Sequence, residues 1–500
     1  MQADDMRAVL VGGGQAVQRN VELATSLGPV ELMAKTARDA AEDAGVGARV
    51  FPLLDAVAVV DVPAWRPRNA PRLLAEALGA RPSLELVTAL GGESPLLLVN
   101  HLAGEIAAGR VRAALLVGSN NIRGFQRARR AGQRVQWPSG GEGEPTKLGI
   151  DKTGSSEREQ RYGLTTPPMI YPLFENALRA HRGLDLETHR ARMGALMHRF
   201  TAVAASNPYA WFPVERSAEA LTTPGPDNRM VAFPYPKYLN AVLETDQSAA
   251  VLLLSASVAR QLGIPDSRFV HWWGGSSAIE EAWFPTERPS FSASDALRSA
   301  AMRALAQAGT SLGELAAFDL YSCFPVAVEM ACEMLGLDES DPRGFTVTGG
   351  LPYFGGPGNN YSLHAVVSMA ERLRSAPGAR GLVTGNGWYL TKHSACVLAS
   401  VPRESGAAPS EAPAFPSAGK PIEAQEEANG RGRVETYTVV FARDGAPERG
   451  IVVGRLGSGA RFLANTPADR ASLEDLLTHE GVGRTGRVAF EDGRNVFRLG

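Results

Sequence analysis

Short apolar runs of strand length alternate with amphipathic, helix-length segments in two parts of the chain. In the first part, strand-like runs at 54–60 and 84–89 flank a helix-like segment at 70–78. In the second part, a helix-like segment at 293–308 is followed by a strand-like run at 316–321. Strands that alternate with helices predict a parallel sheet with helices on its faces. We therefore expect an α/β fold with two similar βαβαβ halves.

The remaining segments differ from these two halves. Residues 120–239 are rich in Arg, Pro and aromatic residues and show few strand patterns, whereas 401–420 have the Pro-, Ala-, Ser- and Glu-rich composition of a linker. Short strand-like runs with turn residues between them follow, which is typical of a small all-β barrel. The expected organisation is a first half at 1–119 and 240–266, an intervening region at 120–239, a second half at 267–402, a linker at 403–422 and a barrel at 423–500.

Charge and cysteine content exclude several classes of protein. The 51 basic and 53 acidic residues are nearly balanced, so no overall field directs the chain to nucleic acid or membrane. Three cysteines, Cys323, Cys332 and Cys396, cannot form a disulfide framework, and we expect no metal site. The N-terminal segment is acidic where a signal peptide is basic, and no apolar run reaches the ~20 residues that a membrane-spanning helix requires. We expect a soluble, cytoplasmic protein.

A glycine-rich turn at 344–358 precedes a helix-like segment. Glycines allow the backbone to approach a ligand closely, and the start of a helix presents free N–H groups to an anion. The alternative is a tight loop that only closes onto the helix. The residues of this turn that could bind a ligand are Gly355, Gly356, Pro357, Gly358, Asn359 and Asn360.

A cluster of arginines lies at the start of the intervening region. Its members include Arg123, Arg127 and Arg130. Guanidinium groups can bind phosphates through two hydrogen bonds, although such a cluster is more often a solvated surface. The sequence alone leaves both interpretations open.

Four sequence blocks occur in the order found in thiolases. They are the turn and helix-like segment at 91–108, LETDQSAAVLLLS at 243–255, YSCF at 321–324 and GGPG at 355–358. As a set they resemble the thiolase superfamily, and the chain is most similar to thiolase-like proteins of the acetyl-CoA acetyltransferase class that carry an additional C-terminal domain. The resemblance covers about residues 5–400. It implies a five-layered α-β-α-β-α fold, an OB-like C-terminal barrel, and coenzyme A or acyl-CoA as a ligand under residues 120–239, with no covalently bound cofactor.

The same resemblance indicates an incomplete catalytic set. Thiolase chemistry needs a thiolate nucleophile, a base and oxyanion donors. The position of the nucleophilic cysteine falls on Gly92, and that of the activating histidine falls on Gly356. Ser94 of the family's CxS pattern is retained, but we expect it to be the N-cap of the following helix. Cys323 matches a cysteine that acts as the second acid/base in the sterol-carrier-protein type of thiolase.

Other side chains could replace the missing groups. Cys323 could be a nucleophile, and His364 or His393 could line the pocket as a base. Each has a structural alternative, a packed cysteine or a buried histidine with satisfied hydrogen bonds. We therefore expect a protein that binds CoA or acyl-CoA without classical thiolase activity. The alternatives are an active acyltransferase that uses Cys323, and a scaffold whose barrel binds a protein or, less favoured, nucleic acid.

Overall fold

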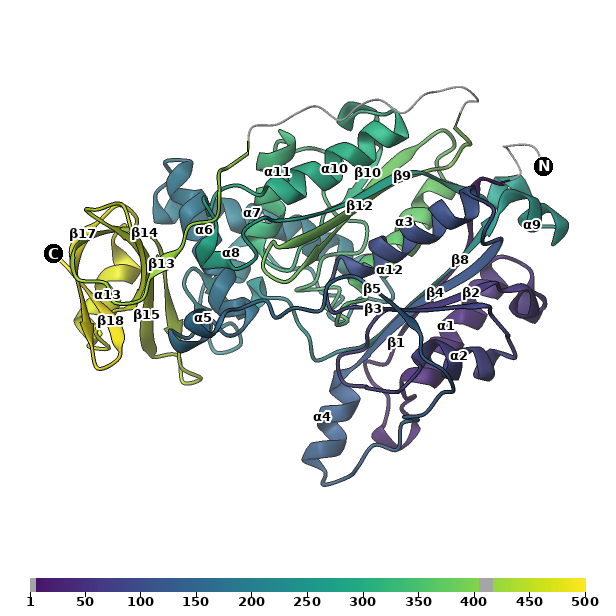
Figure 1. Cartoon of the computed structure of the whole chain (residues 1–500), viewed down its shortest axis with the longest axis horizontal. Coiled ribbons are helices and arrows are strands. Elements are labelled where there is room, and N and C mark those ends of the chain that lie inside the picture. The colour runs from purple at the N-terminus through teal and green to yellow at the C-terminus, as the bar shows by residue number, and fades with distance from the viewer. Residues whose placement is uncertain (1–5, 404–416) are drawn as a thin grey trace.

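A ten-stranded mixed sheet forms the larger part of the computed structural model, which describes residues 6–403 and 417–500 (Figure 1). Its strands follow the order β10-β11-β12-β9-β1-β8-β4-β2-β3-β5. Their bounds, in chain order, are β1 Ala8–Val17, β2 Ala56–Val59, β3 Leu84–Thr88, β4 Ala113–Asn121, β5 Thr146–Leu148, β8 Asp246–Ser255, β9 Val270–Ile279, β10 Ala317–Asp319, β11 Arg380–Gly387 and β12 Lys392–Ala399.

The sheet consists of two half-sheets with the same pairing pattern. In the first, β8 is antiparallel to β1 and β4, and β4 is parallel to β2. In the second, β12 is antiparallel to β9 and β11, and β11 is parallel to β10. A short antiparallel contact, Val9 with His271 and Leu10 with Val270, joins the halves. The expectation of two similar halves is confirmed.

Helices form the other three layers. Helices α3 and α12 lie between the half-sheets, α1 and α2 cover the outer face of the first, and α10 with α11 covers the second (Figure 1). Residues at helical spacing are buried along these helices because their apolar faces pack on the strands. The bounds are α1 Pro29–Asp43, α2 Ala70–Leu78, α3 Ser94–Ala107, α9 Ala256–Gln261, α10 Asp295–Ala308, α11 Pro325–Leu335 and α12 Tyr361–Arg374.

The intervening region is mainly helical, with α6 and α7 packed against α11 of the second half. It also contributes the two short strands β6 and β7, which the short, proline-containing sequence did not indicate. The bounds are α4 Ile122–Arg130, α5 Glu157–Arg161, α6 Pro167–His181, α7 Leu186–Ser206, α8 Ala218–Thr222, β6 Met230–Ala232 and β7 Tyr235–Pro236.

The C-terminal region forms a closed five-stranded barrel, as expected. Pairing runs β14-β15-β16-β18-β17 and returns to β14, which closes the barrel around buried apolar side chains such as Phe462 and Phe497. The bounds are β13 Ala424–Gln425, β14 Gly430–Phe441, β15 Pro447–Leu456, β16 Arg461–Asn465, α13 Arg470–Thr478, β17 Thr485–Glu491 and β18 Arg494–Leu499. The local sequence pattern does not indicate β18.

The barrel is anchored on the rest of the molecule by buried polar contacts. The fully buried Arg461 contacts Glu435 of β14 at 2.7 Å and donates to the carbonyl of Thr286 at 3.0 Å. On the other side, Asn176 of α6 donates to the carbonyl of Tyr437 at 2.9 Å. Most of the expected linker at 403–422 lies outside the described residues. Among those described, no helix combines the length and apolar character needed to cross a membrane.

Candidate functional site

The turn before α3 brings Gly92 against side chains of the second half. The hydroxyl of Tyr321, which follows β10, and the carbonyl oxygen of Asn386, 2.6 Å away, fill the space that a Cβ atom on Gly92 would occupy. The carbonyl of Gly92 accepts a hydrogen bond of 2.9 Å from Ser362 of α12. The position expected for a nucleophile is therefore occupied by a tyrosine hydroxyl and is closed to a larger residue.

Cys323 lies in the same buried cluster. The Asn386 amide nitrogen is 4.0 Å from its sulfur and donates to the Tyr171 hydroxyl at 2.9 Å, which in turn donates to the carbonyl of Trp388. Burial raises the pKa of the Cys323 thiol to about 12. Because the thiolate is the nucleophilic form, this environment disfavours nucleophilic catalysis by Cys323.

The turn that contacts Tyr171 has a strained backbone. Trp388 and Leu390 have φ values of 56° and 54°, which is unusual for large side chains. The Tyr171 hydroxyl bonds to the Trp388 carbonyl, and Arg288 donates to the Leu390 carbonyl at 2.8 Å. These buried donors hold a conformation that the residues would otherwise avoid, directly beside Asn386.

A buried ion pair adjoins Gly92. Glu93 contacts Lys392 of β12 at 2.7 Å, and Lys392 also donates to the carbonyl of Leu90 at 2.7 Å. Burial raises the pKa of Glu93, and the charge of Lys392 opposes that shift. The pair links the start of α3 to the second half and fixes the turn that carries Gly92.

Ser94 does not cap the helix, so this prediction was wrong. Helix α3 begins at Ser94, and Glu93 occupies the N-cap position without a side-chain capping bond. Ser94 lies inside the first turn, so its hydroxyl points back and donates to the carbonyl of Ala89 at 2.9 Å. The side chain is 1% exposed, and we assign it a structural contact.

The two candidate histidines contact other parts of the core. His364 of α12 is fully buried, contacts the Gln15 side-chain oxygen at 2.8 Å and packs edge-on against Phe354. His393 lies next to Lys392 on β12, so its side chain points to the opposite face, where Nε2 is 3.4 Å from the hydroxyl of Ser294. Burial lowers the pKa of both histidines to about 3. Neither is placed to activate Cys323 in this structure.

The N–H groups of the glycine-rich turn are partly used inside the protein. Gly356 donates to the carbonyl of Val242 at 2.8 Å, and Gly358 donates to that of Gly356. Asn359 accepts from the backbone of Gly91 at 3.0 Å, and Asn360 donates to the carbonyl of Gly118 at 2.7 Å. These bonds tie the turn to the first half of the fold, so the turn shapes the site more than it offers free donors.

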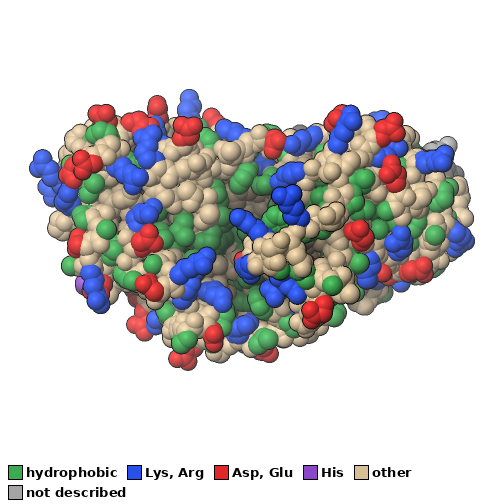
Figure 2. Space-filling view, turned by 90° about the horizontal axis from the view of Figure 1, so that it is seen from below, with side chains coloured by type: hydrophobic (Ala, Val, Ile, Leu, Met, Phe, Trp, Pro, Cys, Tyr) green, Lys and Arg blue, Asp and Glu red, His purple; other side chains and the backbone are tan. Residues whose placement is uncertain are grey.

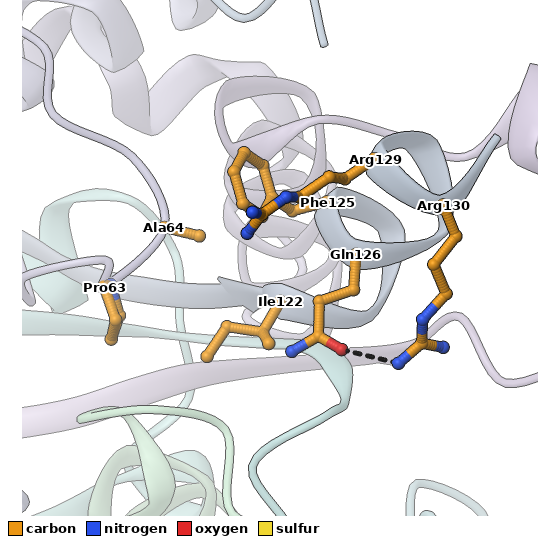
Figure 3. A pocket seen from close by; sticks show the side chains of 7 residues that line it. All are labelled: Pro63, Ala64, Ile122, Phe125, Gln126, Arg129 and Arg130. Carbon is orange, nitrogen blue, oxygen red and sulfur yellow. Dashed lines mark hydrogen bonds between the residues drawn. The ribbon is translucent and has the colours of Figure 1, made fainter. Parts of the chain in front are cut away.

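The arginine cluster is divided between two cavities and a structural contact. Arg123 stacks on Trp211 at 5.6 Å and lines a cavity of about 850 Å³ together with Arg19, Arg229 and Lys237. A second cavity of about 610 Å³ beside α4 is lined by Phe125, Gln126, Arg129 and Arg130, with Arg130 donating to Gln126 at 3.0 Å (Figure 3). Arg127 donates to the carbonyl of Val21. On this side of the molecule, Lys and Arg side chains surround a hollow with apolar side chains inside it (Figure 2).

The larger cavity adjoins the buried cluster through one segment. Ala241 and Val242 line the cavity, and the backbone of Ala241 donates to the carbonyl of Cys323 at 3.0 Å. The carbonyl of Val242 accepts from Gly356 of the glycine-rich turn. The structure therefore brings Arg123, the glycine-rich turn and Cys323 together around this segment, whereas Arg130 faces the second cavity.

Sequence reasoning missed several members of the cluster. Tyr171 lies in a segment with no recognised motif, no role was predicted for Asn386 itself, and Glu93 and Lys392 were not paired. One signal could have suggested the pair: Glu93 and Lys392 both lie next to strongly apolar segments. Charged residues in such segments are rarely buried unless they are paired with an opposite charge.

Comparisons with known proteins agree with this architecture. Residues 417–494 match the family model of the thiolase-like protein type 1 additional C-terminal domain. The crystal structure of a monomeric SCP2-thiolase-like protein type 1 from Mycobacterium smegmatis is 34% identical over 100% of both chains, with a TM-score of 0.83. The chain belongs to the SCP2-thiolase-like proteins of type 1. The Ltp2–ChsH2(DUF35) aldolase shares the fold at 18% identity and a TM-score of 0.59, over 80% of this chain and 99% of that one. No curated protein matches the sequence.

In this SCP2-thiolase-like protein, the additional C-terminal domain pairs with a strand of the intervening region. The matched segment, 417–494, includes β14, β15, β16 and β17 of the closed barrel and ends at the first residue of β18. In this member of the type 1 family, the barrel's β14 also pairs with β6 of the intervening region, where Val440 lies opposite Ala232.

Proposed function

We propose that the protein binds coenzyme A or an acyl-CoA thioester and does not carry out classical thiolase chemistry. The observation that carries the proposal is that Gly92 stands where thiolases have their nucleophilic cysteine. The Tyr321 hydroxyl fills the space that a side chain at this position would need. A thioester cannot form there. The raised pKa of Cys323 and the position of His393, which is buried against Ser294, give no substitute pair of nucleophile and base.

The proposed ligand site is the larger cavity. Arg19, Arg123, Arg229 and Lys237 supply positive charge suited to phosphates, and Trp211 and Phe212 supply aromatic surface. The segment at 241–242 lies between this cavity and Cys323, so a thioester arm would extend along it toward the buried cluster.

A calorimetric titration with CoA tests the binding part of the proposal. Arg123→Met should weaken binding by about 10-fold or more, because a charge-assisted hydrogen bond contributes ~1.5–3 kcal/mol. Arg129→Met is the matched control, because Arg129 lies on the same helix, α4, but lines the second cavity. Absence of heat and of a melting shift with CoA well above ~1 mM would remove the proposal.

Intact-mass analysis after incubation with acetyl-CoA or acetoacetyl-CoA tests the catalytic part. We expect no acyl adduct on the wild-type protein. A stable adduct that disappears in Cys323→Ala would instead support an acyltransferase that uses Cys323.

A second candidate function is suggested by the outer surface of the barrel. Arg431 of β14 lies directly opposite Arg487 of β17, and both are exposed, whereas the next arginine in the row, Arg498 of β18, is paired with Glu491 at 2.7 Å. Like charges placed opposite each other destabilise a sheet, so an acidic protein partner would relieve the repulsion. Titration with polyglutamate should show salt-dependent binding that Arg431→Glu with Arg487→Glu abolishes, and equal binding by this variant would argue against a partner site.

A further inference from the structure

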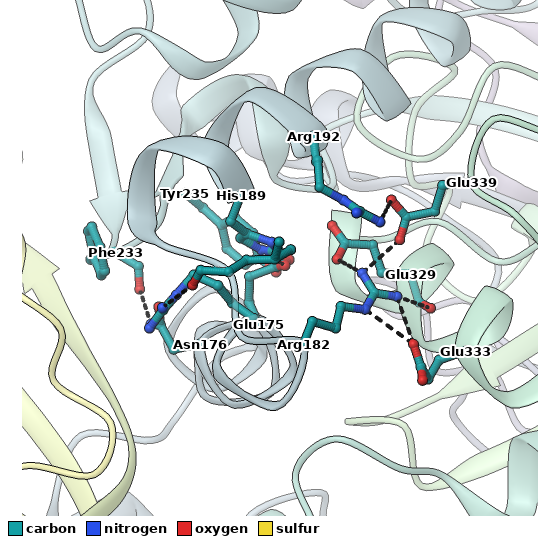
Figure 4. A network of polar contacts seen from close by, with 12 residues as sticks. Glu175, Asn176, Arg182, His189, Arg192, Phe233, Tyr235, Glu329, Glu333 and Glu339 are labelled. Carbon is teal, nitrogen blue, oxygen red and sulfur yellow. Dashed lines mark hydrogen bonds and ion pairs between the residues drawn. The ribbon is translucent and has the colours of Figure 1, made fainter.

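A buried polar cluster lies where three helices meet, apart from the cavity assigned to the ligand (Figure 4). Glu175 comes from α6, His189 from α7 and Glu329 from α11, and each is at most 1% exposed. Potential ligand atoms of the three residues all lie within 4.8 Å of one another. Side chains that face each other across packed helices are a common way of building a metal site in a helical core.

The contacts inside the cluster leave ligand capacity unused. His189 Nε2 is 2.5 Å from Glu175 Oε1, and the Tyr235 hydroxyl donates to Glu175 Oε2. Arg182 donates to Glu329 Oε2 at 2.9 Å, whereas the buried Glu329 Oε1 accepts no hydrogen bond from a nitrogen or hydroxyl donor among the described residues. The Glu329 carboxyl lies within hydrogen-bonding reach of the Glu175 carboxyl, and two facing carboxylates in the interior must share a proton or bind a cation.

The surrounding charges are also unbalanced. Four carboxylates gather around two guanidinium groups (Figure 4). Arg182 contacts Glu329, Glu333 and Glu339, and Arg192 contacts Glu339 as well. The fourth carboxylate, Glu175, lies beside Glu329. Glu333 and Arg192 reach solvent, but in the buried part of the network Glu175, Glu329 and Glu339 surround the single guanidinium of Arg182. Such an excess of negative charge must be compensated by bound protons or by a cation.

We propose that Glu175, His189 and Glu329 bind a divalent transition-metal ion of the Zn²⁺ type. An imidazole nitrogen and two carboxylate oxygens are ligands that Zn²⁺ accepts in proteins, with a fourth position open to water or to the hydroxyl of Tyr235. Arg182 engages only one oxygen of Glu329 and leaves the other for the ion. The metal would displace the proton shared by Glu175 and His189, and their contact would widen by about 1 Å to give metal–ligand bonds of ~2.0–2.2 Å.

The consequence of this site is structural. Helices α6 and α7 belong to the intervening region, whereas α11 belongs to the second half. One ion would hold the two together in the interior. The site shares no residue with the cavity proposed for CoA, so it stands or falls independently of that proposal.

Metal content of the full-length protein tests the site directly. After exposure to ZnCl₂ and gel filtration, elemental analysis should find one equivalent of zinc, and the melting temperature should rise with Zn²⁺ concentration because the ion binds only the folded state. Substitution with Co²⁺ should give the visible bands of a four-coordinate ion. Since the site is buried, the same measurements are made on protein refolded from urea with Zn²⁺ present.

Variants separate this site from adventitious binding. Glu329→Gln and His189→Gln should each weaken Zn²⁺ binding by at least ~10–100-fold. Glu333→Gln is the matched control, because Glu333 also contacts Arg182 but is outside the three-residue cluster, and it should retain binding within about 2-fold of wild type. Circular dichroism establishes that each variant is folded. Absence of stoichiometric zinc from both native and refolded wild-type protein would overturn the proposal, as would undiminished binding by folded Glu329→Gln and His189→Gln.

Discussion

Lys392 and Glu93 form a buried ion pair of 2.7 Å that joins the two halves of the fold beside the candidate site. Their side chains are 3% and 5% exposed. A buried pair contributes little net stability compared with apolar residues, but it is costly to break because one charge is then left without compensation.

Lys392→Met should therefore destabilise the protein by about 3–5 kcal/mol, because Glu93 is left alone in the interior. Urea denaturation would measure the change in the free energy of unfolding. The double variant Glu93→Gln with Lys392→Met should recover much of the loss. A cost below about 1 kcal/mol for the single variant would show that the pair is solvated.

Gly92→Ala should destabilise the protein by about 1–3 kcal/mol, because a Cβ atom would overlap the Tyr321 hydroxyl and the Asn386 carbonyl. The matched control is Gly104→Ala in the adjacent helix α3, where no atom lies within 4 Å of the added Cβ. That control should stabilise by about 0.5–1 kcal/mol, as expected for alanine in a helix. Equal melting temperatures for the two variants would contradict the closed position at Gly92.

His364 should make the protein less stable as the pH falls. Burial lowers its pKa to about 3, below the 6.5 of an unperturbed histidine, so between these values the unfolded chain binds the extra proton. This contribution is complete above pH 6.5 and is lost toward pH 3. His364→Asn should lose about 1.4 kcal/mol less than wild type between pH 6 and 5, measured by urea denaturation at both values. Identical losses would place His364 in contact with solvent.

Arg461→Met should loosen the barrel, because Arg461 is buried and satisfies Glu435 together with two backbone carbonyls. The expected cost is about 3–5 kcal/mol, with faster hydrogen exchange in residues 417–500. The control is Arg455→Met. Arg455 is the other partner of Glu435, and because its side chain is 35% exposed, its loss should cost at most about 1 kcal/mol. Unchanged exchange in Arg461→Met would argue against this anchor.

The two half-sheets were predictable because apolar strand runs and helical periodicity are local properties. The start of β12 was not. Its first residues, Lys392, His393 and Ser394, look like a loop because they are polar, yet each is buried against a distant partner: Glu93, Ser294 or Ser277. Only the folded chain shows that these polar groups are satisfied, whereas the local pattern predicts a strand that begins at the apolar residue Cys396.

The candidate site was predicted in part for the same reason. The motifs indicated a missing side chain at Gly92, because that position is fixed by sequence order. Local sequence did not show that the Tyr321 hydroxyl occupies the space beside Gly92. It also did not show that Asn386 and Tyr171 lie next to Cys323. Such contacts depend on how α6 of the intervening region packs against β11, which local pattern does not encode.

The pairing of β14 with β6 links the C-terminal barrel indirectly to the cavity proposed as the ligand site. Arg229 and Lys237, two of the basic residues that line it, flank the β6–β7 hairpin, and Ala232 of that hairpin lies opposite Val440 of the barrel. The barrel thus supports the wall of the cavity through the β6–β7 hairpin, although it does not line the cavity itself. A chain cut before residue 417 would keep every residue that lines this cavity but would lose the strand pairing that supports the hairpin between Arg229 and Lys237.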